Sequence, residues 1–479
     1  MVRRLLRIAL AAFVSLCAAG ALAYWGLGLR IRLDGSGIPR VRTAAPPDQV
    51  AARLEEHRAA QLVQPAAVET APESPPRPVR AREAAPRREY WTGFRGPSRD
   101  GRYQERPILT AWPPTGFTPV WKQPIGGGYA SFAIARGRAF TIEQRRAQEV
   151  VAAYDVATGR ELWTDAWDAA FTEWMGGDGP RATPTWFDGR VYVLGAEGEL
   201  RSLDEATGRV AWRVNILDDN AAHNLTWGMA ASPLVFDDLV VVVPGGPVQR
   251  SVVAYDRHTG ARRWGSLTDK AAYSSPVLAT LAGTRQIVVL LAGRAVGLAP
   301  ETGELLWTYP WPTTNDINVA QPVIVGDAGV LLSSGYGHGA ALIEVTHEGG
   351  RFGTRLVWEH NRLKNRFSSS VVHDGFIYGL DEAILTCLDA RTGEVKWKAG
   401  RYGHGQFLLA SGHLVMLSEE GELALVRATP AGHEEVARFP VLAGKTWNHP
   451  ALDDGRLLVR NLAEMAAFDL RLPGAADRP

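Results

Sequence analysis

Short runs of apolar and β-branched residues alternate with turns rich in Gly and Asp through most of the chain after residue 90. Residues 191–193 and 239–243 illustrate the runs, and Asp188-Gly189 and Asp374-Gly375 illustrate the turns. Runs of this length predict strands, and the Asp-Gly pair accepts the positive φ that tight hairpin turns require. The pattern therefore predicts an all-β domain made of many short antiparallel strands.

One motif recurs among these strands: a small residue, Asp two positions later, then Thr-Gly, and Trp four positions after the Gly. Four full copies contain Asp155, Asp204, Asp256 and Asp389. Two degenerate copies keep only part of the motif before their Trp. The six Trp residues are 49, 52, 43, 51 and 39 positions apart. These intervals are typical of β-propeller blades, which use about 40–50 residues each.

Each copy predicts the same local structure. The Asp carboxylate accepts backbone N–H groups across the Thr-Gly turn, and the Gly takes the left-handed conformation. The outer strand that follows carries an indole wide enough to fill the wedge between two twisted sheets, with its N–H bonded to nearby backbone. We therefore expect six tryptophans to pack between blades: Trp163, Trp212, Trp264, Trp307, Trp358 and Trp397.

Two weaker units complete the count. One runs from Gln406 to Phe439, and the other ends near Asp469 without an outer Trp strand. Residues 120–122, near the start of the folded region, can supply that strand, and the pairing would close the ring and remove two exposed edges. The sequence thus predicts an eight-bladed β-propeller of four-stranded antiparallel blades over residues 90–475. The blade count stays open by one, because the unit at Gln406 is weak.

The N-terminus predicts export. Three Arg residues precede an uncharged run over residues 8–29, and its length is enough to cross a hydrocarbon core of about 30 Å as a helix. We favour an uncleaved membrane anchor over residues 1–32, and the alternative is a signal peptide cleaved after residues 21–23. Residues 33–89 are rich in Pro, Ala, Arg and Glu and lack periodic apolar positions. We expect them to form a disordered, semi-extended linker.

The charge balance argues against nucleic acid as a partner. The chain has 52 Lys and Arg against 51 Asp and Glu, a formal net charge of +1. No polycationic field is therefore predicted to gather phosphates. The two cysteines, Cys17 and Cys387, lie in the apolar N-terminal run and deep in the repeats, so we expect no structural disulfide.

The Asp-x-x-Thr-Gly-x-x-x-Trp copies resemble the repeat of the pyrroloquinoline-quinone (PQQ) superfamily of propellers. The opening Trp91-Thr92-Gly93-Phe94-Arg95-Gly96-Pro97, followed by Arg99-Asp100-Gly101, looks like the lead-in of bacterial PQQ-like propeller repeat proteins. Those proteins are similar to the propeller subunit of the outer-membrane barrel-assembly machinery, a scaffold without an active site. The superfamily also contains quinoprotein alcohol and glucose dehydrogenases, so the resemblance implies the fold and not the activity.

The resemblance does not supply a catalytic set. In the alcohol dehydrogenases of the superfamily, a disulfide between adjacent cysteines packs on the cofactor, an Asp abstracts the alcohol proton, and Ca²⁺ held by Glu and Asn polarises the quinone. This chain has no adjacent cysteines, although glucose-type members lack that disulfide too. No Glu, Asn and Asp set at recognisable spacing can be carried over. We therefore expect no catalytic residue and no cofactor, with PQQ and Ca²⁺ as the alternative.

Binding residues are expected on the segments that join the outer strand of one blade to the inner strand of the next. These segments gather on one face around the central channel, and here they are unusually polar and aromatic. In the alternative interpretation, their side chains only satisfy loop backbone and a water-filled channel. The candidates are Trp174, Asp178, His223, Asn224, Trp227, Asn315, Asn318, Lys364, Arg366, His404, Gln406, Trp447 and Asn448.

The sequence predicts a non-catalytic scaffold on the outer face of a bacterial inner membrane, with the channel mouth receiving a protein segment or a small ligand. A PQQ-dependent dehydrogenase that oxidises alcohols or sugars is the alternative. A ligand sensor ranks last, because about seven residues before the apolar run are too few for an output domain. No metal site is expected, because the spacing of His223, His338, His404 and His449 matches no metal-binding pattern.

Overall fold

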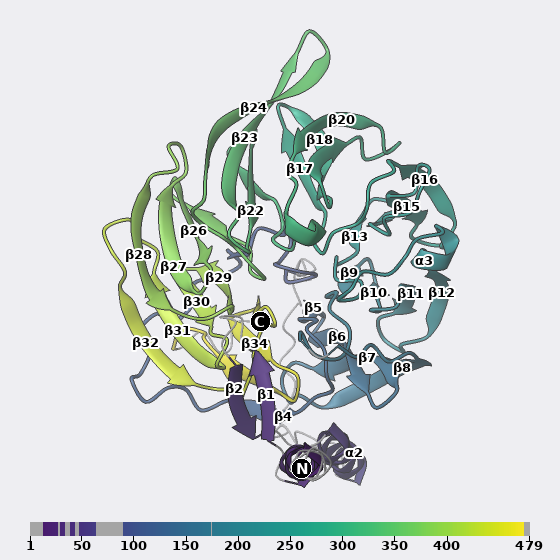
Figure 1. Cartoon of the computed structure of the whole chain (residues 1–479), viewed down its shortest axis with the longest axis vertical. Coiled ribbons are helices and arrows are strands. Elements are labelled where there is room, and N and C mark those ends of the chain that lie inside the picture. The colour runs from purple at the N-terminus through teal and green to yellow at the C-terminus, as the bar shows by residue number, and fades with distance from the viewer. Residues whose placement is uncertain are drawn as a thin grey trace, which may run out of the picture.

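Eight β-sheets stand as blades around a central channel (Figure 1). The computed structural model describes residues 13–26, 29–33, 39–43, 47–63, 90–173 and 175–473. In seven blades the strands follow in chain order from the channel to the rim, and all eight have four antiparallel strands. The predicted eight-bladed propeller is confirmed, and the weak unit at Gln406 forms a complete sheet.

The first four blades follow one another along the chain. Blade 1 contains β5 (Ala133–Ala135), β6 (Arg138–Arg145), β7 (Gln148–Asp155) and β8 (Glu161–Asp168). Blade 2 contains β9 (Thr185–Phe187), β10 (Arg190–Leu194), β11 (Glu199–Asp204) and β12 (Val210–Asn215), which leads into the short helix α3 (Ile216–Asp219). Blade 3 contains β13 (Leu234–Phe236), β14 (Leu239–Val242), β15 (Val252–Asp256) and β16 (Arg262–Ser266). Blade 4 contains β17 (Val277–Leu281), β18 (Thr284–Leu290), β19 (Arg294–Leu298) and β20 (Leu305–Pro310), and the 3₁₀ turn η2 (Thr314–Asp316) follows it.

The last four blades complete the ring. Blade 5 contains β21 (Val323–Val325), β22 (Gly329–Ser334), β23 (Gly339–Glu348) and β24 (Arg351–His360). Blade 6 contains β25 (Val371–His373), β26 (Phe376–Asp381), β27 (Ile384–Asp389) and β28 (Val395–Arg401). Blade 7 contains β29 (Gln406–Ala410), β30 (His413–Leu417), β31 (Glu422–Arg427) and β32 (Glu435–Pro440), with β3 (Arg102–Tyr103) added in parallel to β29. Blade 8 contains β33 (Ala451–Asp453), β34 (Arg456–Arg460) and β35 (Glu464–Asp469), with β4 (Trp121–Pro124) as its outer strand.

The ring closes by pairing the two ends of the folded region. β4 lies antiparallel to β35, with Trp121 opposite Ala467 and Lys122 opposite Ala466. Just before β4, the Val120 N–H donates to the Ala467 carbonyl at 2.8 Å. The predicted closure by residues 120–122 is therefore confirmed. Because β4 pairs with β35, the edge of β35 that faces away from β34 is not exposed.

The repeat motif joins each blade to the next. Asp204 Oδ1 accepts the Thr207 N–H at 2.9 Å, and Gly208 has a φ of +72°. A Cβ on Gly208 would lie 2.4 Å from the Trp163 ring of the preceding blade, so only Gly lets the indole pack on the turn. Trp163 Nε1–H then donates to the Glu205 carbonyl at 3.0 Å. The same indole-to-backbone bond to the next blade is made by Trp121, Trp212, Trp264, Trp358 and Trp397.

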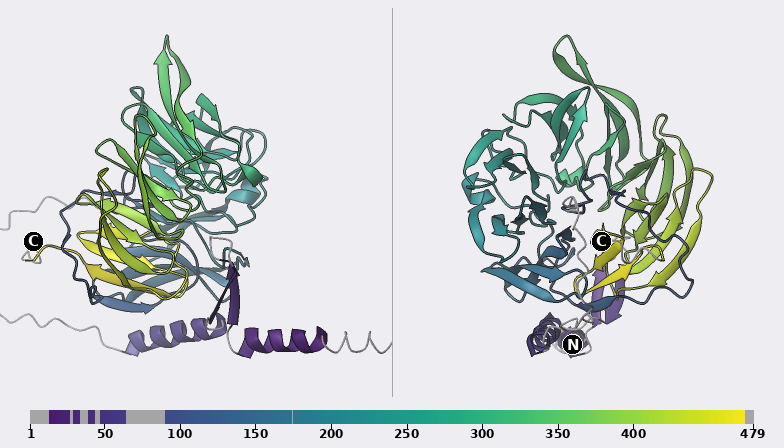
Figure 2. Two further views of the ribbon diagram at one scale, coloured as in Figure 1. Left: turned by 60° about the vertical axis from the view of Figure 1, so that its left-hand side comes forward. Right: turned by 180° about the vertical axis from the view of Figure 1, so that it is seen from behind.

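Trp307 departs from this arrangement. Its Nε1–H donates to Gln286 Oε1 of its own blade at 2.6 Å. The next blade has no Thr-Gly turn to receive it, because β23 and β24 continue into a hairpin that projects beyond the ring (Figures 1 and 2). The missing turn therefore removes the backbone acceptor, and a buried side chain replaces it.

The N-terminal elements lie beside the ring near β4 (Figure 2). Residues 13–21 are helical and continue into the π-helical turn η1 (Leu22–Gly26). β1 (Leu29–Leu33) then pairs with β2 (Pro39–Thr43). Within the parts of the chain that the structure describes, no helix is long and apolar enough to cross a membrane. Residues 8–12 and 27–28 of the predicted span lie outside those parts.

The expected disordered linker over residues 33–89 contains regular structure in its described part. β2 lies within it, and helix α2 spans Pro47–Val63. α2 begins with Pro and has Asp48 in its first turn, both favourable at a helix N-terminus. Ala, Leu, Glu, Gln and Arg follow, all strong helix formers. Residues 64–89 lie outside the described residues.

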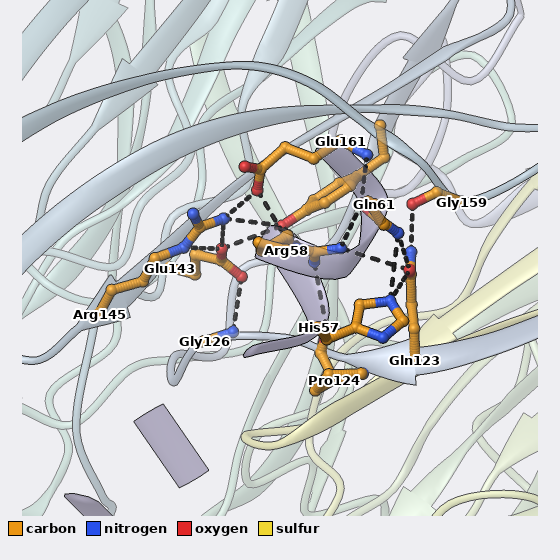
Figure 3. Close-up of polar contacts among 11 residues, drawn as sticks. His57, Arg58, Gln61, Gln123, Pro124, Gly126, Glu143, Arg145, Gly159 and Glu161 are labelled. Atoms are coloured by element: carbon orange, nitrogen blue, oxygen red, sulfur yellow. Dashed lines mark hydrogen bonds and ion pairs between the residues drawn. The ribbon is translucent and has the colours of Figure 1, made fainter. Parts of the chain in front are cut away.

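Contacts with the ring fix α2 at the seam between β4 and blade 1 (Figure 3). Arg58 donates to the Pro124 carbonyl at 3.1 Å and pairs with Glu161 at 3.2 Å. His57 Nε2 lies 2.8 Å from Gln123 Oε1. Leu54, only 3% exposed, adds an apolar contact surface. The helix therefore covers the outer strand that closes the ring.

Candidate functional site

A belt of polar residues marks where the chain enters each innermost strand. The Ser131 N–H donates to Thr183 Oγ1, the Thr183 N–H to Ser232 Oγ, and the Ser232 N–H to Ser275 Oγ, each at 2.9 Å. The same bond joins blades 5 and 6 at 2.9 Å. These bonds hold neighbouring connections in register around the channel. The belt consists of Ser131, Thr183, Ser232, Ser275, Gln321, Ser369, Gln406 and His449.

Two residues before each belt residue, the chain passes the rim of the channel mouth. Blades 6, 7, 8 and 1 place rings at this position: Phe367, His404, Trp447 and Tyr129. The Phe367 ring centroid lies 4.5 Å from that of Trp447 and 5.3 Å from that of His404. Tyr129 stacks on Trp447 at 5.3 Å. We call these four residues the aromatic sector. The remaining rim positions hold Arg181, Ala230, Tyr273 and Val319.

Cations flank the aromatic sector. Lys445 Nζ lies 3.9 Å from the Trp447 ring centroid, and the Arg181 guanidinium lies 5.8 Å from that of Tyr129. Trp447 Nε1–H donates to Glu419 Oε1 at 2.9 Å, which fixes the indole. Tyr129, Phe367 and Trp447 are only half-buried. The sector therefore offers accessible apolar surface beside positive charge, a combination suited to cation–π and stacking contacts with a partner.

Several predicted site residues instead hold the fold together. Asn318 is fully buried and donates to the carbonyls of Leu291 and Ala292. Asn448 is also fully buried and donates to the carbonyls of Gly128 and Ala130. Further bonds or ion pairs join Gln406 to the Phe367 carbonyl, Lys364 to Asp381 and Arg366 to Glu382.

The other predicted residues lie around the mouth but outside the aromatic sector. Asp178 Oδ1 accepts the Glu173 N–H at 3.2 Å, and Asn224 donates to the Ala196 carbonyl at 3.0 Å. The Trp227 ring centroid lies 5.7 Å from that of Tyr273. His223 and Asn315 are exposed, and Trp174 lies outside the described residues.

Sequence reasoning missed Tyr129, Phe367 and Tyr273. The signal was present, because each of them lies two positions before Ser131, Ser369 or Ser275, as Trp447 lies two positions before His449. Aligning the units on the belt residue, instead of on the Trp of the outer strand, would have placed all these rings at one position of the repeat.

The lead-in segment (residues 91–101) lies in the channel against the innermost strands. It fills the channel at the end of each innermost strand from which the first hairpin turn begins. Backbone bonds attach it to three blades, since the Trp91 carbonyl accepts from Ile134 and the Thr92 carbonyl from Trp186, each at 2.7 Å, and the Gly101 carbonyl accepts from Leu409 at 2.8 Å. Its other hydrogen bonds connect it to all of the remaining blades. In blade order, the partners are Ile134, Trp186, Ser232, Pro276, Gln321, Ser369, Leu409 and Asp453.

Two buried guanidinium groups hold this segment in place. Arg99 donates to the carbonyls of Ser232 at 3.1 Å and Pro276 at 3.0 Å, and Arg95 to that of Ser369 at 3.0 Å. Both side chains are almost fully buried, and their other hydrogen bonds also go to neutral oxygens. Burial lowers the pKa of Arg99 to about 9 and that of Arg95 to about 10. The channel thus contains two cations that form no hydrogen bond to a carboxylate of the described residues.

His449 lies beside these cations on the wall of the channel. Its ring stacks 6.2 Å from that of Trp91 and lies 5.7 Å from that of Phe94. The Nδ1 atom lies 2.7 Å from the Pro450 carbonyl, so the neutral ring donates from Nδ1. Burial and the nearby Arg95 charge lower the pKa of His449 to about 3. The imidazole is therefore neutral at physiological pH.

The two guanidinium groups of the lead-in segment, Arg95 and Arg99, are not placed to hold the carboxylates of PQQ. The three carboxylates of PQQ require cations whose N–H groups have no other acceptor. Arg95 and Arg99 instead donate their N–H groups to backbone and side-chain oxygens. In the described residues, no group of three His, Cys, Asp or Glu side chains is placed to hold a metal ion. Cys17 and Cys387 are far apart in the sequence and both free.

The comparisons with known proteins point to one family. The family model described as outer membrane protein assembly factor BamB matches residues 147–399. The factor BamB of Burkholderia pseudomallei is 24% identical over 374 residues, which cover 73% of this chain and 89% of that protein. The BamB of Yersinia pestis is 22% identical over 288 residues, covering 55% of this chain and 68% of that protein.

A shorter stretch matches a dehydrogenase. The quinohemoprotein alcohol dehydrogenase of Comamonas testosteroni is 33% identical over 123 residues, but these span only 16% of its length. Its crystal structure superposes with a TM-score of 0.57 at 14% identity, over 91% of this chain and 85% of that one. This likeness shows the shared propeller fold alone.

The solved BamB structure has the same fold. The crystal structure of BamB from Moraxella catarrhalis superposes with a TM-score of 0.54 at 15% identity, over 75% of this chain and 99% of that chain. The family model spans residues 147–399, more than half of the 479 residues, and covers blades 2 to 5 in full and blade 6 as far as residue 399. The chain therefore belongs to the family of outer membrane protein assembly factor BamB.

Proposed function

We propose that this chain is a non-catalytic scaffold that holds a segment of a partner protein against the aromatic sector. The observation that supports the proposal is the cluster of half-buried Tyr129, Phe367 and Trp447 rings, whose centroids lie 5.3 Å (Tyr129 to Trp447) and 4.5 Å (Phe367 to Trp447) apart. Large aromatic side chains contribute most of the binding energy at many protein interfaces. The rings come from connections of different blades on a closed ring, so little rearrangement is needed when a partner binds.

The lead-in segment supports a particular binding geometry. It fills the channel below the belt and contacts all eight blades. A bound segment would therefore lie across the mouth and not thread through the ring. The matched relatives are named as outer membrane protein assembly factors, so we propose that the partner is a protein of that process.

Site-specific crosslinking tests the proposal. A photoreactive p-benzoylphenylalanine at Phe367 is expected to form a covalent adduct with one protein partner in the producing cell. Because a central aromatic side chain contributes about 2 kcal/mol or more to such an interface, adding Trp447→Ala should lower the adduct yield at least about tenfold. The matched control carries the same photoreactive residue at Leu162, which is 44% exposed on the outer strand β8.

Two results would contradict this function. The first is the same adduct pattern from positions 162 and 367, which would indicate contact without a defined site. The second is dye-linked oxidation of alcohols or sugars above background after reconstitution with PQQ and Ca²⁺, which would favour the dehydrogenase alternative.

We also propose that residues 1–32 tether the propeller to the outer face of a bacterial inner membrane as a single-pass anchor. The uncharged run over residues 8–29 supports this location. The protein is expected to stay with the membrane fraction after alkaline carbonate washing, and protease added to spheroplasts should degrade the propeller. Release by carbonate, or a mature chain that begins after residue 23, would rule out the anchor.

A further inference from the structure

A cavity of about 330 Å³ lies between the lead-in segment and the innermost strands of blades 4 and 5. Ser98, Arg99, Asp100 and Arg102 line one side, and Leu278 of β17 and Ile324 of β21 are among the residues on the other. Gly326, in the turn after β21, also lines it. The cavity shares no lining residue with the aromatic sector, so it is separate from the proposed partner site.

One wall of this cavity carries a cation without a partner. In the described part of the chain, the Arg102 guanidinium makes no hydrogen bond or ion pair, and its Nε is buried. The nearby Asp100 carboxylate accepts the Arg102 backbone N–H at 2.9 Å instead. Arg102 as a whole is half-buried, and a bound carboxylate or phosphate would satisfy its buried Nε and pair with the guanidinium charge.

The charge around Arg102 adds to this preference for an anion. Arg99 also lines the cavity, and Arg95 lies behind it with its NH2 on the Asp100 carbonyl at 3.0 Å. Two guanidinium groups and the single carboxylate of Asp100 thus line the cavity, which leaves its lining with a net positive charge. Burial lowers the pKa of both Arg99 and Arg95, as expected where positive charges lack compensation.

The opposite wall is apolar. Leu278, Ala279 and Ile324 are half-buried and Val323 is buried, and all four line the cavity. The volume lies at the lower end of the range for small-molecule sites, about 300–1,000 Å³. One free guanidinium facing an apolar wall matches a single carboxylate on an apolar group better than a phosphate, which would need more donors.

We propose that this cavity binds a carboxylate attached to an apolar group, with Arg102 as the carboxylate ligand and β17 and β21 as the apolar wall. Two sources share this chemistry: the C-terminal residue of a polypeptide and a free apolar carboxylic acid. The proposal does not depend on the aromatic sector, so failure of either one leaves the other standing.

Isothermal titration of the full chain with four probes tests the proposal. The probes are 3-phenylpropionate, its neutral amide, the tripeptide acetyl-Gly-Gly-Phe with a free carboxylate, and the same tripeptide as its amide. At least one acid should bind, and its matched amide should bind at least about tenfold more weakly, since a charge-assisted bond contributes about 1.5–3 kcal/mol. Binding of the tripeptide acid identifies a polypeptide C-terminus, whereas binding of 3-phenylpropionate alone identifies a free acid.

Three variants localise the binding. Arg102→Gln should weaken binding of the acid probe at least about tenfold. Ala279→Phe should prevent its binding, because the larger side chain fills the cavity while every charge stays in place. Arg106→Gln is the matched control, because Arg106 belongs to the same stretch of chain but pairs with Asp454 outside the cavity. Near-ultraviolet circular dichroism verifies that each variant is folded. Equal affinity for acid and amide, or full affinity in Arg102→Gln, would overturn the proposal.

Discussion

A disulfide across the closure of the ring is expected to raise the free energy of unfolding by about 4 kcal/mol. The two substitutions are Lys122→Cys and Ala466→Cys, made in a Cys17→Ser background. Residues 122 and 466 lie directly opposite each other on β4 and β35, where cross-strand Cβ atoms are close enough for an S–S bond. The loop that the disulfide closes contains more than 300 residues, so it strongly restricts the unfolded chain.

Urea unfolding of the oxidised and reduced forms of the same molecule measures the effect. The control pairs Lys122→Cys with Glu464→Cys, which lies two residues away from the partner of residue 122 on the same strand. This control should form little disulfide and gain no stability from oxidation. A stable disulfide in the control but not in the test pair would mean that the closure has a different register.

Acid is expected to destabilise the propeller through His449. The buried ring has a pKa of about 3 in the folded protein, whereas an unfolded His has a pKa of about 6.5. Between these values the unfolded chain binds more protons, so stability is complete above about pH 6.5 and falls as the pH decreases. From pH 7 to pH 4, this group alone should remove about 3 kcal/mol from the free energy of unfolding.

Comparison with His449→Gln isolates this contribution from the carboxylates that titrate in the same range. Urea unfolding of both proteins at pH 7 and pH 4 gives two pH-dependent losses, and the loss should be about 3 kcal/mol larger with His present. Any difference in their stabilities at pH 7 cancels in this comparison. Equal losses would show that His449 takes up its proton in the folded state as easily as in the unfolded chain.

The architecture was predictable from the sequence because its determinants are local. Asp204, Gly208 and Trp212 lie within one short motif, and each copy specifies its own turn and its contact with a neighbour. Even the closure by residues 120–122 could be predicted, since the last unit lacked one strand. The helix α2 was missed because the Pro-rich composition of residues 33–89 as a whole obscured a short stretch of strong helix formers.

The candidate site was only partly predictable. His404 and Trp447 were found from the polarity of their loops, but their neighbours Phe367 and Tyr129 come from other blades. The contacts of Arg99 could not be found from sequence at all. Its guanidinium bonds to backbone carbonyls 133 and 177 residues away, and backbone acceptors have no sequence signal.

The closure also constrains when the protein can fold. Residues 91–124 are synthesised before any blade, yet their partners include Asp453 and the strand Glu464–Asp469, which are synthesised after blades 1 to 7. Contacts between residues this far apart along the chain form slowly, because the entropy of closing a long loop is lost before the contact stabilises the fold. Until β35 has been synthesised, β4 has no strand to pair with and the ring of blades stays open. Folding of this propeller is thus completed only after blade 8 has been synthesised, and chaperones can engage the open intermediate until then.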